Sequence, residues 1–296
     1  MKFLEKKVVL AVELILAIGL VSCQHENVPT PALPNPASAQ ALRDGISASL
    51  PKMYQLIKHG DVTLSYFDNG KLKKASFGAN MRGSYLTNVT YAYNTNSIVA
   101  TITNNSKVVQ INTFSLDANT GNCYESSQIT YMPLGTNSYQ QQEIILSYAY
   151  NAKGQLTDIT DKKAPNIKTV FGYNAIGDLN KISYYGYSGT GPAPKLLLES
   201  TLSYERPGGD PILDDLSPVN FEEANLPDPY LKIFGKQAKH LVSMITEKST
   251  PGGRYYNYIV NNDGYVTKRE TYKLIGAALV ETKLYDYVVT EMTLHL

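Results

Sequence analysis

The chain has 296 residues, of which 43% are hydrophobic and 18% charged, with 27 Lys plus Arg against 26 Asp plus Glu. That length holds one large or two ordinary domains, and the aromatic content excludes intrinsic disorder as the main state. The net charge of +1 gives no electrostatic footprint for nucleic acid, so no nucleic-acid partner is expected. With 23 Tyr, 7 Phe and no Trp, the aromatic residues suit half-exposed sheet faces and wetted binding surfaces.

The amino terminus is typical of a secretory signal, because basic residues precede an apolar run over residues 8–20. A helix of that run is too short to cross roughly 30 Å of hydrocarbon. The sequence Leu20-Val21-Ser22-Cys23 resembles the lipobox of bacterial lipoproteins, in which the cysteine is lipidated and begins the mature chain. The resemblance implies a signal peptide over 1–22 and acyl chains such as palmitate on Cys23. An ordinary signal peptide with an incidental cysteine is the alternative.

Two segments are expected between the cysteine and the main domain. Residues 23–40 contain four prolines among small and polar residues, which favours an extended tether between a membrane and the domain. Residues 41–58 carry apolar residues at helical spacing on both sides of Pro51, which predicts a short helical lead-in. If Cys23 carries lipid, Cys123 has no disulfide partner in the chain, and the fold depends on its core and its sheet hydrogen bonds.

A repeated pattern organises the remainder: Tyr, any, Tyr, Asn, two free positions, Gly, any, Leu, two free positions, Ile. The segments 148–159 and 171–182 follow it closely, and 91–102 and 258–266 are looser copies. Aromatic residues two apart point to one face of a strand, while Asn opens a type I turn and Gly takes a positive φ. Each copy therefore predicts a β-hairpin, commonly with a bulge. Leu156 and Ile159 share a face only if such a bulge intervenes.

The predicted fold is mainly β, a long antiparallel meander of about 12–15 strands over residues 59–296. Such a meander curls into an open or closed barrel-like sheet with short helical caps, because a long flat sheet is unusual. An insertion at 206–240, with five prolines and several apolar residues, breaks the rhythm. A connection of this length is a plug over an open end of the rolled sheet or a ligand-gating lid.

The hairpin pattern is similar to degenerate YD repeats of the RHS type, with Asn151 and Asn174 in place of the usual aspartate. Together with the lipobox and the tether, it resembles uncharacterised Bacteroidetes lipoproteins that have a porin-like β-fold. The resemblance implies a shape and a location in the bacterial cell envelope, at the periplasmic face or surface of the outer membrane. It implies no activity.

Catalytic and metal-binding signatures are scarce. The sequence contains no HExxH motif and no paired CxxC motif, so no metal, no cofactor and no catalytic residue is predicted. The functional hint is aromatic: two tyrosine clusters lie beside glycine-rich stretches and could stack on a ligand. Their members are Tyr184, Tyr185, Tyr187, Tyr255, Tyr256 and Tyr258. Cross-strand pairing of aromatic side chains is the alternative interpretation.

The leading hypothesis is therefore a non-enzymatic, lipid-anchored envelope protein that binds or scaffolds a glycan or an envelope protein. One alternative is an envelope enzyme that acts on polysaccharide through two carboxylates about 5–9.5 Å apart. Another is an integral outer-membrane barrel, which requires an outward apolar band about 25 Å tall.

Overall fold

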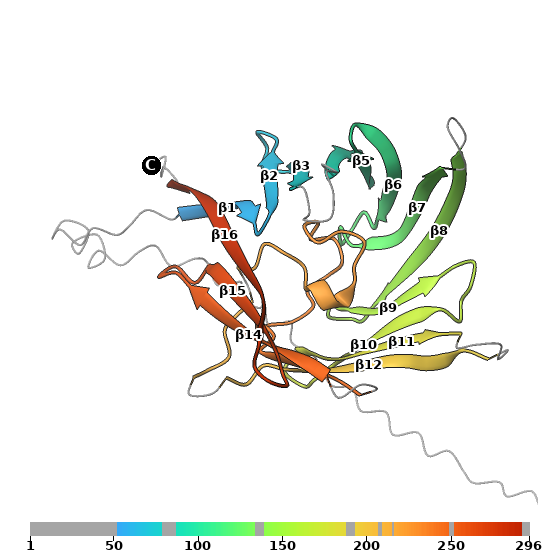
Figure 1. Cartoon of the computed structure of the whole chain (residues 1–296). Helices are drawn as coiled ribbons and strands as arrows, with labels where there is room; N and C mark the ends of the chain where they lie inside the picture. The colour runs from blue at the N-terminus through green and yellow to red at the C-terminus, as the bar shows by residue number, and fades with distance from the viewer. Residues whose placement is uncertain are drawn as a thin grey trace, which may run out of the picture. The chain divides into compact units, whose positions relative to one another are not determined.

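Strands that follow one another along the chain also lie side by side, because each pairs antiparallel with the next. The computed structural model describes residues 52–78, 87–133, 139–187, 193–206, 209–214, 216–248 and 252–291, which contain sixteen strands (Figure 1). These are β1 (Lys52–His59), β2 (Val62–Tyr66), β3 (Leu72–Phe77), β4 (Thr87–Tyr93), β5 (Ser97–Asn104), β6 (Lys107–Leu116), β7 (Cys123–Pro133), β8 (Tyr139–Tyr150), β9 (Leu156–Asp161), β10 (Lys168–Tyr173), β11 (Leu179–Gly186), β12 (Lys195–Ser203), β13 (Met244–Glu247), β14 (Gly252–Val260), β15 (Val266–Lys273) and β16 (Leu279–Glu291).

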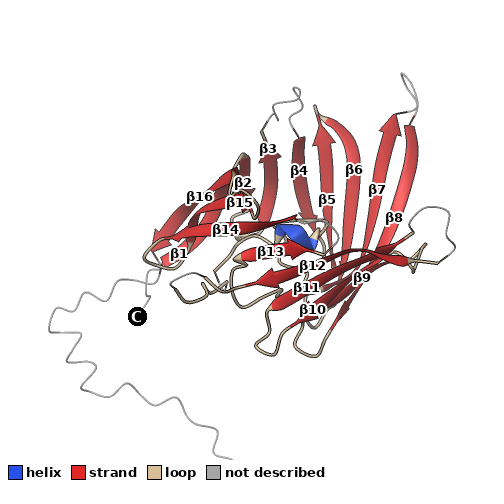
Figure 2. Cartoon of the chain, turned by 60° about the horizontal axis from the view of Figure 1, so that its bottom comes forward, coloured by secondary structure: helices blue, strands red, loops and turns tan. Residues whose placement is uncertain are grey.

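The sheet closes on itself because the first strand pairs with the last. β1 and β16 are antiparallel from Lys52 opposite Glu291 to His59 opposite Tyr285, with a bulge between Leu56 and Lys58 (Figure 2). The predicted antiparallel meander is therefore confirmed, and it is a closed barrel. Its sixteen strands exceed the expected range because the first strand was assigned to a helix.

The helical lead-in predicted for 41–58 is wrong where the structure describes it. Residues 52–58 belong to β1, in which Leu56 and His59 face the interior. The open edge of β16 decides the conformation, because a helix there would leave a row of ladder hydrogen bonds unmade. Residues 41–51, the signal at 1–22 and the tether at 23–40 lie outside the described residues.

Helix is confined to one short element in the described part of the chain. Short helical caps were predicted without a position, and the described residues contain a single 3₁₀ turn, η1 (Glu222–Ala224). No helix among these residues is both long and apolar enough to cross a membrane.

The repeated turn has the predicted chemistry and settles which side chains share a face. Gly154 adopts φ +73° and its amide donates to the Asn151 carbonyl at 2.9 Å. The Asn151 side-chain oxygen accepts from the amide of Gln155 at 3.0 Å. The register shifts beside this turn, so that Leu156 and Ile159 are both buried. A bulge thus places two residues three apart on one face.

The copy at 91–102 shows what the glycine contributes. Ser97 occupies the glycine position there, and its hairpin has no register shift between β4 and β5. Ile98 and Ala100 are consequently the buried residues after this turn, at alternate positions along the strand. The glycine therefore favours a bulge after the turn, and the bulge determines which apolar residues face the core.

Tyrosine hydroxyls join neighbouring hairpins near the repeat turns. In the copies at 148–159 and 171–182, the second aromatic residue donates to a backbone carbonyl of the preceding hairpin, at or just beyond its turn. Seven tyrosines among the described residues donate to a backbone carbonyl of a preceding strand, hairpin or connection, at 2.6 to 3.0 Å: Tyr66 to Leu56, Tyr93 to Leu72, Tyr150 to Cys123, Tyr173 to Leu156, Tyr204 to Leu179, Tyr258 to Val242 and Tyr287 to Val266. The hydroxyl gives Tyr a function that Phe lacks at these positions.

The interior of the barrel is filled by its own chain. Residues 204–243 connect β12 to β13, and the described stretch 216–243 runs between the strand walls, in orange in Figure 1. Phe234 is fully buried, with ring centroids 5.9 Å from Phe114 of β6 and 5.4 Å from Tyr148 of β8. Within the insertion predicted at 206–240, the part from Val219 onward therefore packs inside the bore, whereas Arg206, Asp210 and Leu213 near its start are exposed. Each such buried large apolar side chain contributes about 1.5–3 kcal/mol.

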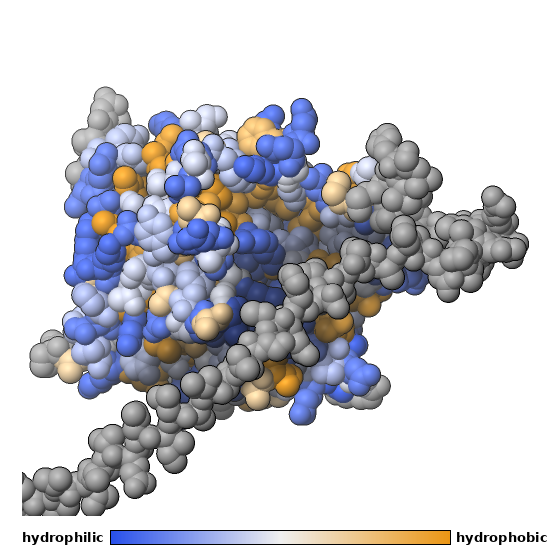
Figure 3. All heavy atoms as spheres, turned by 180° about the vertical axis from the view of Figure 1, so that it is seen from behind, coloured by the Kyte–Doolittle hydropathy of each residue, from blue (hydrophilic) through white to orange (hydrophobic). Residues whose placement is uncertain are grey.

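The outer face carries paired charges. Glu199 of β12 binds Lys181 of β11 at 3.2 Å and Lys248 at 3.3 Å. Further pairs join Lys162 to Glu125, Lys163 to Glu143 and Lys268 to Glu270. Hydrophilic and apolar side chains are interleaved on the face shown in Figure 3. The alternation is thus apolar inward and largely polar outward over these strands.

Candidate functional site

Three of the predicted site tyrosines face the bore and hold the insertion. The hydroxyl of Tyr184 donates to the backbone carbonyl of Glu223 at 2.8 Å, and that of Tyr256 donates to the Glu223 carboxylate. Tyr258 donates to the carbonyl of Val242 at 3.0 Å. Burial raises the pKa of Tyr184, and of Tyr256 and Tyr258 further, so all three stay protonated donors. Their observed bonds belong to the scaffold.

The other three tyrosines face outward but do not form one cluster. Tyr185 lies under the ammonium group of Lys168, which is 5.6 Å from its ring centroid. Tyr187 is 46% exposed and accepts a hydrogen bond from Asn166 at 3.1 Å. Tyr255 stands on β14, where β12 and β13 separate it from β11. The alternation of strand faces therefore divides each predicted cluster.

Tyr255 borders a groove on the outer surface, which we call the tyrosine groove. Its volume is about 890 Å³, and it spans β12 to β15. The cross-strand row Ser203, Met244, Tyr255 and Tyr272 runs through it. The full lining is Ser203, Glu205, Arg206, Ser243, Met244, Tyr255, Tyr256, Asn257, Tyr272 and Leu274.

Two stacked rings form one side of the tyrosine groove. Tyr255 and Tyr272 are directly paired across β14 and β15, with ring centroids 4.8 Å apart and an interplanar angle of 5°. Glu270 accepts hydrogen bonds from the Tyr272 hydroxyl at 2.8 Å and from the Asn257 amide at 3.4 Å. The hydrogen bond from Lys268 lowers the pKa of the Glu270 carboxyl most, and the hydrogen bond from Tyr272 lowers it further. The stack is therefore held in place by an ionised acceptor.

Charged side chains border the tyrosine groove at the end of β12. Glu205 and Arg206 are exposed and adjacent in sequence. Neither side chain has an ion-pair or hydrogen-bond partner among the residues that the structure describes. The groove thus offers an aromatic wall, a guanidinium, a carboxylate and an amide. Of the predicted site residues, it brings together Tyr255 and Tyr256.

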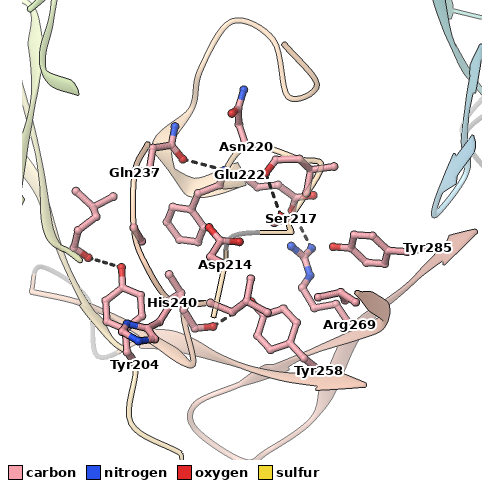
Figure 4. A pocket seen from close by; sticks show the side chains of 17 residues that line it. Tyr204, Asp214, Ser217, Asn220, Glu222, Gln237, His240, Tyr258, Arg269 and Tyr285 are labelled. Atoms are coloured by element: carbon pink, nitrogen blue, oxygen red, sulfur yellow. Dashed lines mark hydrogen bonds and ion pairs between the residues drawn. The ribbon is translucent and has the colours of Figure 1, made fainter. Parts of the chain in front are cut away.

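A second polar cluster lies inside the barrel, where the insertion meets β15 and β16. Arg269, which is 6% exposed, binds Glu222 at 2.9 Å (Figure 4), and it also binds Glu281 at 3.2 Å. Lys283 binds Glu222 as well. Burial opposes ionisation of Glu222, yet the charges of Arg269 and Lys283 hold its pKa at about 2. Glu222 is therefore a permanent anion that fixes η1 to the barrel wall.

The small cavity beside this cluster holds about 40 Å³. Tyr204, His240 and Tyr285 are among the side chains that line it (Figure 4). That volume accommodates only about two or three water molecules. This cavity is therefore too small for a substrate, and the interior cluster positions the insertion.

Sequence reasoning missed both the groove and the interior cluster. In the fourth copy of the repeat, Arg269 occupies the position of Ile159 and Ile182 in two other copies. A charged residue at this inward-facing position was the sequence feature that could have indicated the interior cluster. The groove gave no such signal, because β12 and β13 become neighbours only after the forty-residue connection 204–243. The described residues contain no group of three or more His, Cys, Asp or Glu side chains suited to a metal ion. Cys23 lies outside them.

Two solved structures are similar to this barrel, and both are described as porin-like proteins. One, from Bacteroides uniformis, has a TM-score of 0.54 at 18% identity and covers 82% of this chain and 98% of its own. Another, from Bacteroides vulgatus, has a TM-score of 0.51 at 13% identity and covers 80% and 99%. No protein-family model matches the chain, and no curated protein matches it in sequence. These likenesses confirm the expected porin-like fold; membership of a lipoprotein family and the YD repeats stay predictions.

Proposed function

We propose that this protein is a lipid-anchored component of the bacterial cell envelope, held at the outer membrane through Cys23, and that it is a non-enzymatic binding module. The barrel acts as a rigid support, and the tyrosine groove is the surface that meets the ligand, a glycan or an envelope protein. The lipobox and the tether in the sequence, and the likeness to porin-like proteins from Bacteroides, support the location.

The observation that carries this proposal is the filled bore. Strands on several sides of the barrel bind the insertion: Tyr91 of β4 donates to Asp228 at 2.8 Å, and Arg269 of β15 binds Glu222. A bore occupied by a hydrogen-bonded, apolar segment supports a packed scaffold rather than an open channel. The functional surface is therefore sought on the outside of the barrel.

An integral outer-membrane barrel is the second candidate, favoured by the closed sheet and the porin-like neighbours. The ion pairs on the outer face argue for the anchored module. Glu199, for example, would face lipid together with Lys181 and Lys248. A lysine at the middle of a bilayer costs about 2–4 kcal/mol on the lipid face of a barrel.

The state of the two carboxylates that bind Arg269 supports a non-enzymatic role. A general acid requires a pKa near the working pH, whereas that of Glu222 is held at about 2. Both Glu222 and Glu281 are neutralised by Arg269 and Lys283. A pair of carboxylates for glycoside hydrolysis is therefore not supported by this cluster.

Fractionation of cells that express the full chain tests the location. We expect the wild-type protein to pellet with membranes and to resist a high-salt wash, whereas Cys23→Ser leaves unprocessed or soluble protein. Cys123→Ala, which removes the buried cysteine instead, should fractionate like the wild type. A Cys23→Ser protein that stays in the membrane until detergent is added would favour the integral barrel, and a soluble wild-type protein would contradict the anchor.

A further inference from the structure

We infer that the tyrosine groove binds a neutral oligosaccharide, with one pyranose ring lying against the face of Tyr255 that is turned away from Tyr272. This inference rests on the proposed binding function and names the ligand class for the same groove. Three properties of the groove lead to it: a fixed aromatic face, a balanced set of hydrogen-bonding groups, and its size.

The aromatic face follows from the order of the strands. In the sheet, Tyr255 is placed between Met244 of β13 and Tyr272 of β15. One face of the Tyr255 ring stacks on Tyr272, and both rings line the groove together with Met244. Glu270 fixes the Tyr272 hydroxyl behind it. A ring that is already held in place loses little freedom on binding, and its flat apolar face matches the C–H face of a pyranose.

The polar groups around the groove match hydroxyls better than charges. Arg206 donates only, the carboxylate of Glu205 accepts only, and the side-chain amide of Asn257 does both. A sugar hydroxyl both donates and accepts, so neighbouring hydroxyls can use all three groups. The charges of Glu205 and Arg206 cancel in sum, and a charged ligand would meet one like charge.

The size and shape of the groove favour a chain of sugars. Sites for drug-sized ligands have volumes of about 300–1,000 Å³, and the tyrosine groove lies near the upper end at about 890 Å³. Besides the tyrosines, its apolar lining is limited to Met244 and Leu274. A protein partner could also use Tyr and Arg side chains, but it is anchored in deep, fully desolvated pockets, whereas exposed Glu205 and Arg206 keep this groove in contact with water. An extended, hydroxyl-rich ligand fits better than a peptide.

Calorimetric titration of the full chain carrying Cys23→Ser tests the inference, with maltohexaose, cellohexaose, xylohexaose and mannohexaose as probes. We expect at least one of them to bind, and Tyr255→Ala to weaken that binding by about 10-fold or more. Tyr255→Phe, which keeps the flat face, should remain within about 3-fold of the wild type. Tyr131→Ala is the matched control, because Tyr131 lines a separate outer groove on β6–β8.

A second variant keeps the test valid if Tyr255→Ala does not fold. Arg206 is exposed and has no described partner, so Arg206→Gln should leave the thermal unfolding unchanged and weaken oligosaccharide binding by about 3-fold or more. Failure of all four neutral hexasaccharides to bind, or binding that is indifferent to both Tyr255→Ala and Arg206→Gln, overturns the inference.

A crosslinking experiment separates this failure from failure of the proposed function. A photo-crosslinking amino acid in place of Asn257 reports on what occupies the groove in intact cells. Capture of one defined envelope protein, abolished by Tyr272→Ala, would overturn the oligosaccharide inference and leave the binding function standing. Capture of a second copy of this chain would overturn the inference as well. If neither oligosaccharide nor protein is found at the groove, both proposals fail.

Discussion

At the scale of single residues, the abundance of tyrosine has a structural cause. The second aromatic residue of the repeat packs its ring in the barrel and uses its hydroxyl to bind a backbone carbonyl of the neighbouring hairpin. Tyr173 does so with Leu156 at 2.8 Å, and burial raises its pKa, which keeps the hydroxyl a donor. The high tyrosine content suggested a wetted binding surface, but several of these tyrosines instead connect neighbouring segments through hydroxyl-to-carbonyl hydrogen bonds.

Removal of one such hydroxyl should have a measurable cost. Tyr173→Phe keeps the ring but leaves the Leu156 carbonyl without this bond, so we expect the free energy of unfolding to fall by about 1 kcal/mol. Tyr124→Phe is the control, since Tyr124 is 52% exposed and makes no described hydrogen bond through its hydroxyl. Urea unfolding measures both variants. Equal stability of the two variants would show that the hydroxyl bond contributes nothing net.

At the scale of elements, the insertion is held by buried polar groups. Asp178, in the turn between β10 and β11, accepts hydrogen bonds from the amides of Lys239 and His240 at 2.7 and 3.1 Å. Asp228, inside the insertion, accepts from the amides of Tyr230 and Leu231. These carboxylates organise a segment that has almost no secondary structure of its own.

His59 makes the attachment of the insertion sensitive to pH. It is 4% exposed, its Nδ1 lies 3.3 Å from the Tyr230 hydroxyl, and Lys283, Arg269 and Glu222 surround it with charge. Burial, aided by the charge of Lys283, lowers its pKa from about 6.5 to about 4. Between those pH values the unfolded chain binds more protons than the folded protein, so stability is fully present above pH 6.5 and falls as the pH falls toward 4.

We expect the free energy of unfolding to drop by an amount on the order of 3 kcal/mol between pH 6.5 and pH 4 through His59 alone. His59→Gln should flatten this part of the profile. Glu222, whose pKa is held at about 2, adds a further loss below about pH 4.5 because its ionised form is favoured in the folded state. Denaturant unfolding at a series of pH values checks both. A profile for His59→Gln that is parallel to that of the wild type would contradict the assignment.

The sequence predicted local structure well and long-range structure less well. The Asn-to-Gly turns depend on residues within five positions of one another, so the hairpins followed from the pattern, whereas the pairing register had to show that a bulge places Leu156 and Ile159 on one face. Residues 52–58 were misassigned because their apolar spacing fits a helix, whereas pairing with β16, more than 220 positions away, imposes a strand. The tyrosine groove depends in the same way on contacts between β12, β13, β14 and β15.

At the scale of the whole molecule, the closure of the sheet into a barrel and the packing of its interior depend on each other. Sixteen strands enclose more space than their own side chains occupy, and the connection 204–243 supplies the missing interior. The connection begins after β12, and the repeat turns also follow even-numbered strands. The connection therefore starts at the same end of the barrel as the repeat turns. Porin-like architecture here encloses a packed core, which is why the function is sought on the outer surface.

Amide hydrogen exchange of the insertion, measured on the full chain, tests the central claim that this segment fills the bore. The amides of Tyr230, Leu231, Lys239 and His240 donate to buried carboxylates. We expect them to exchange at least about 1,000-fold more slowly than in an unstructured chain, in line with amides of the barrel strands. Exchange of these four amides at unstructured rates, while the strand amides stay protected, would show that the bore is open and would contradict the account.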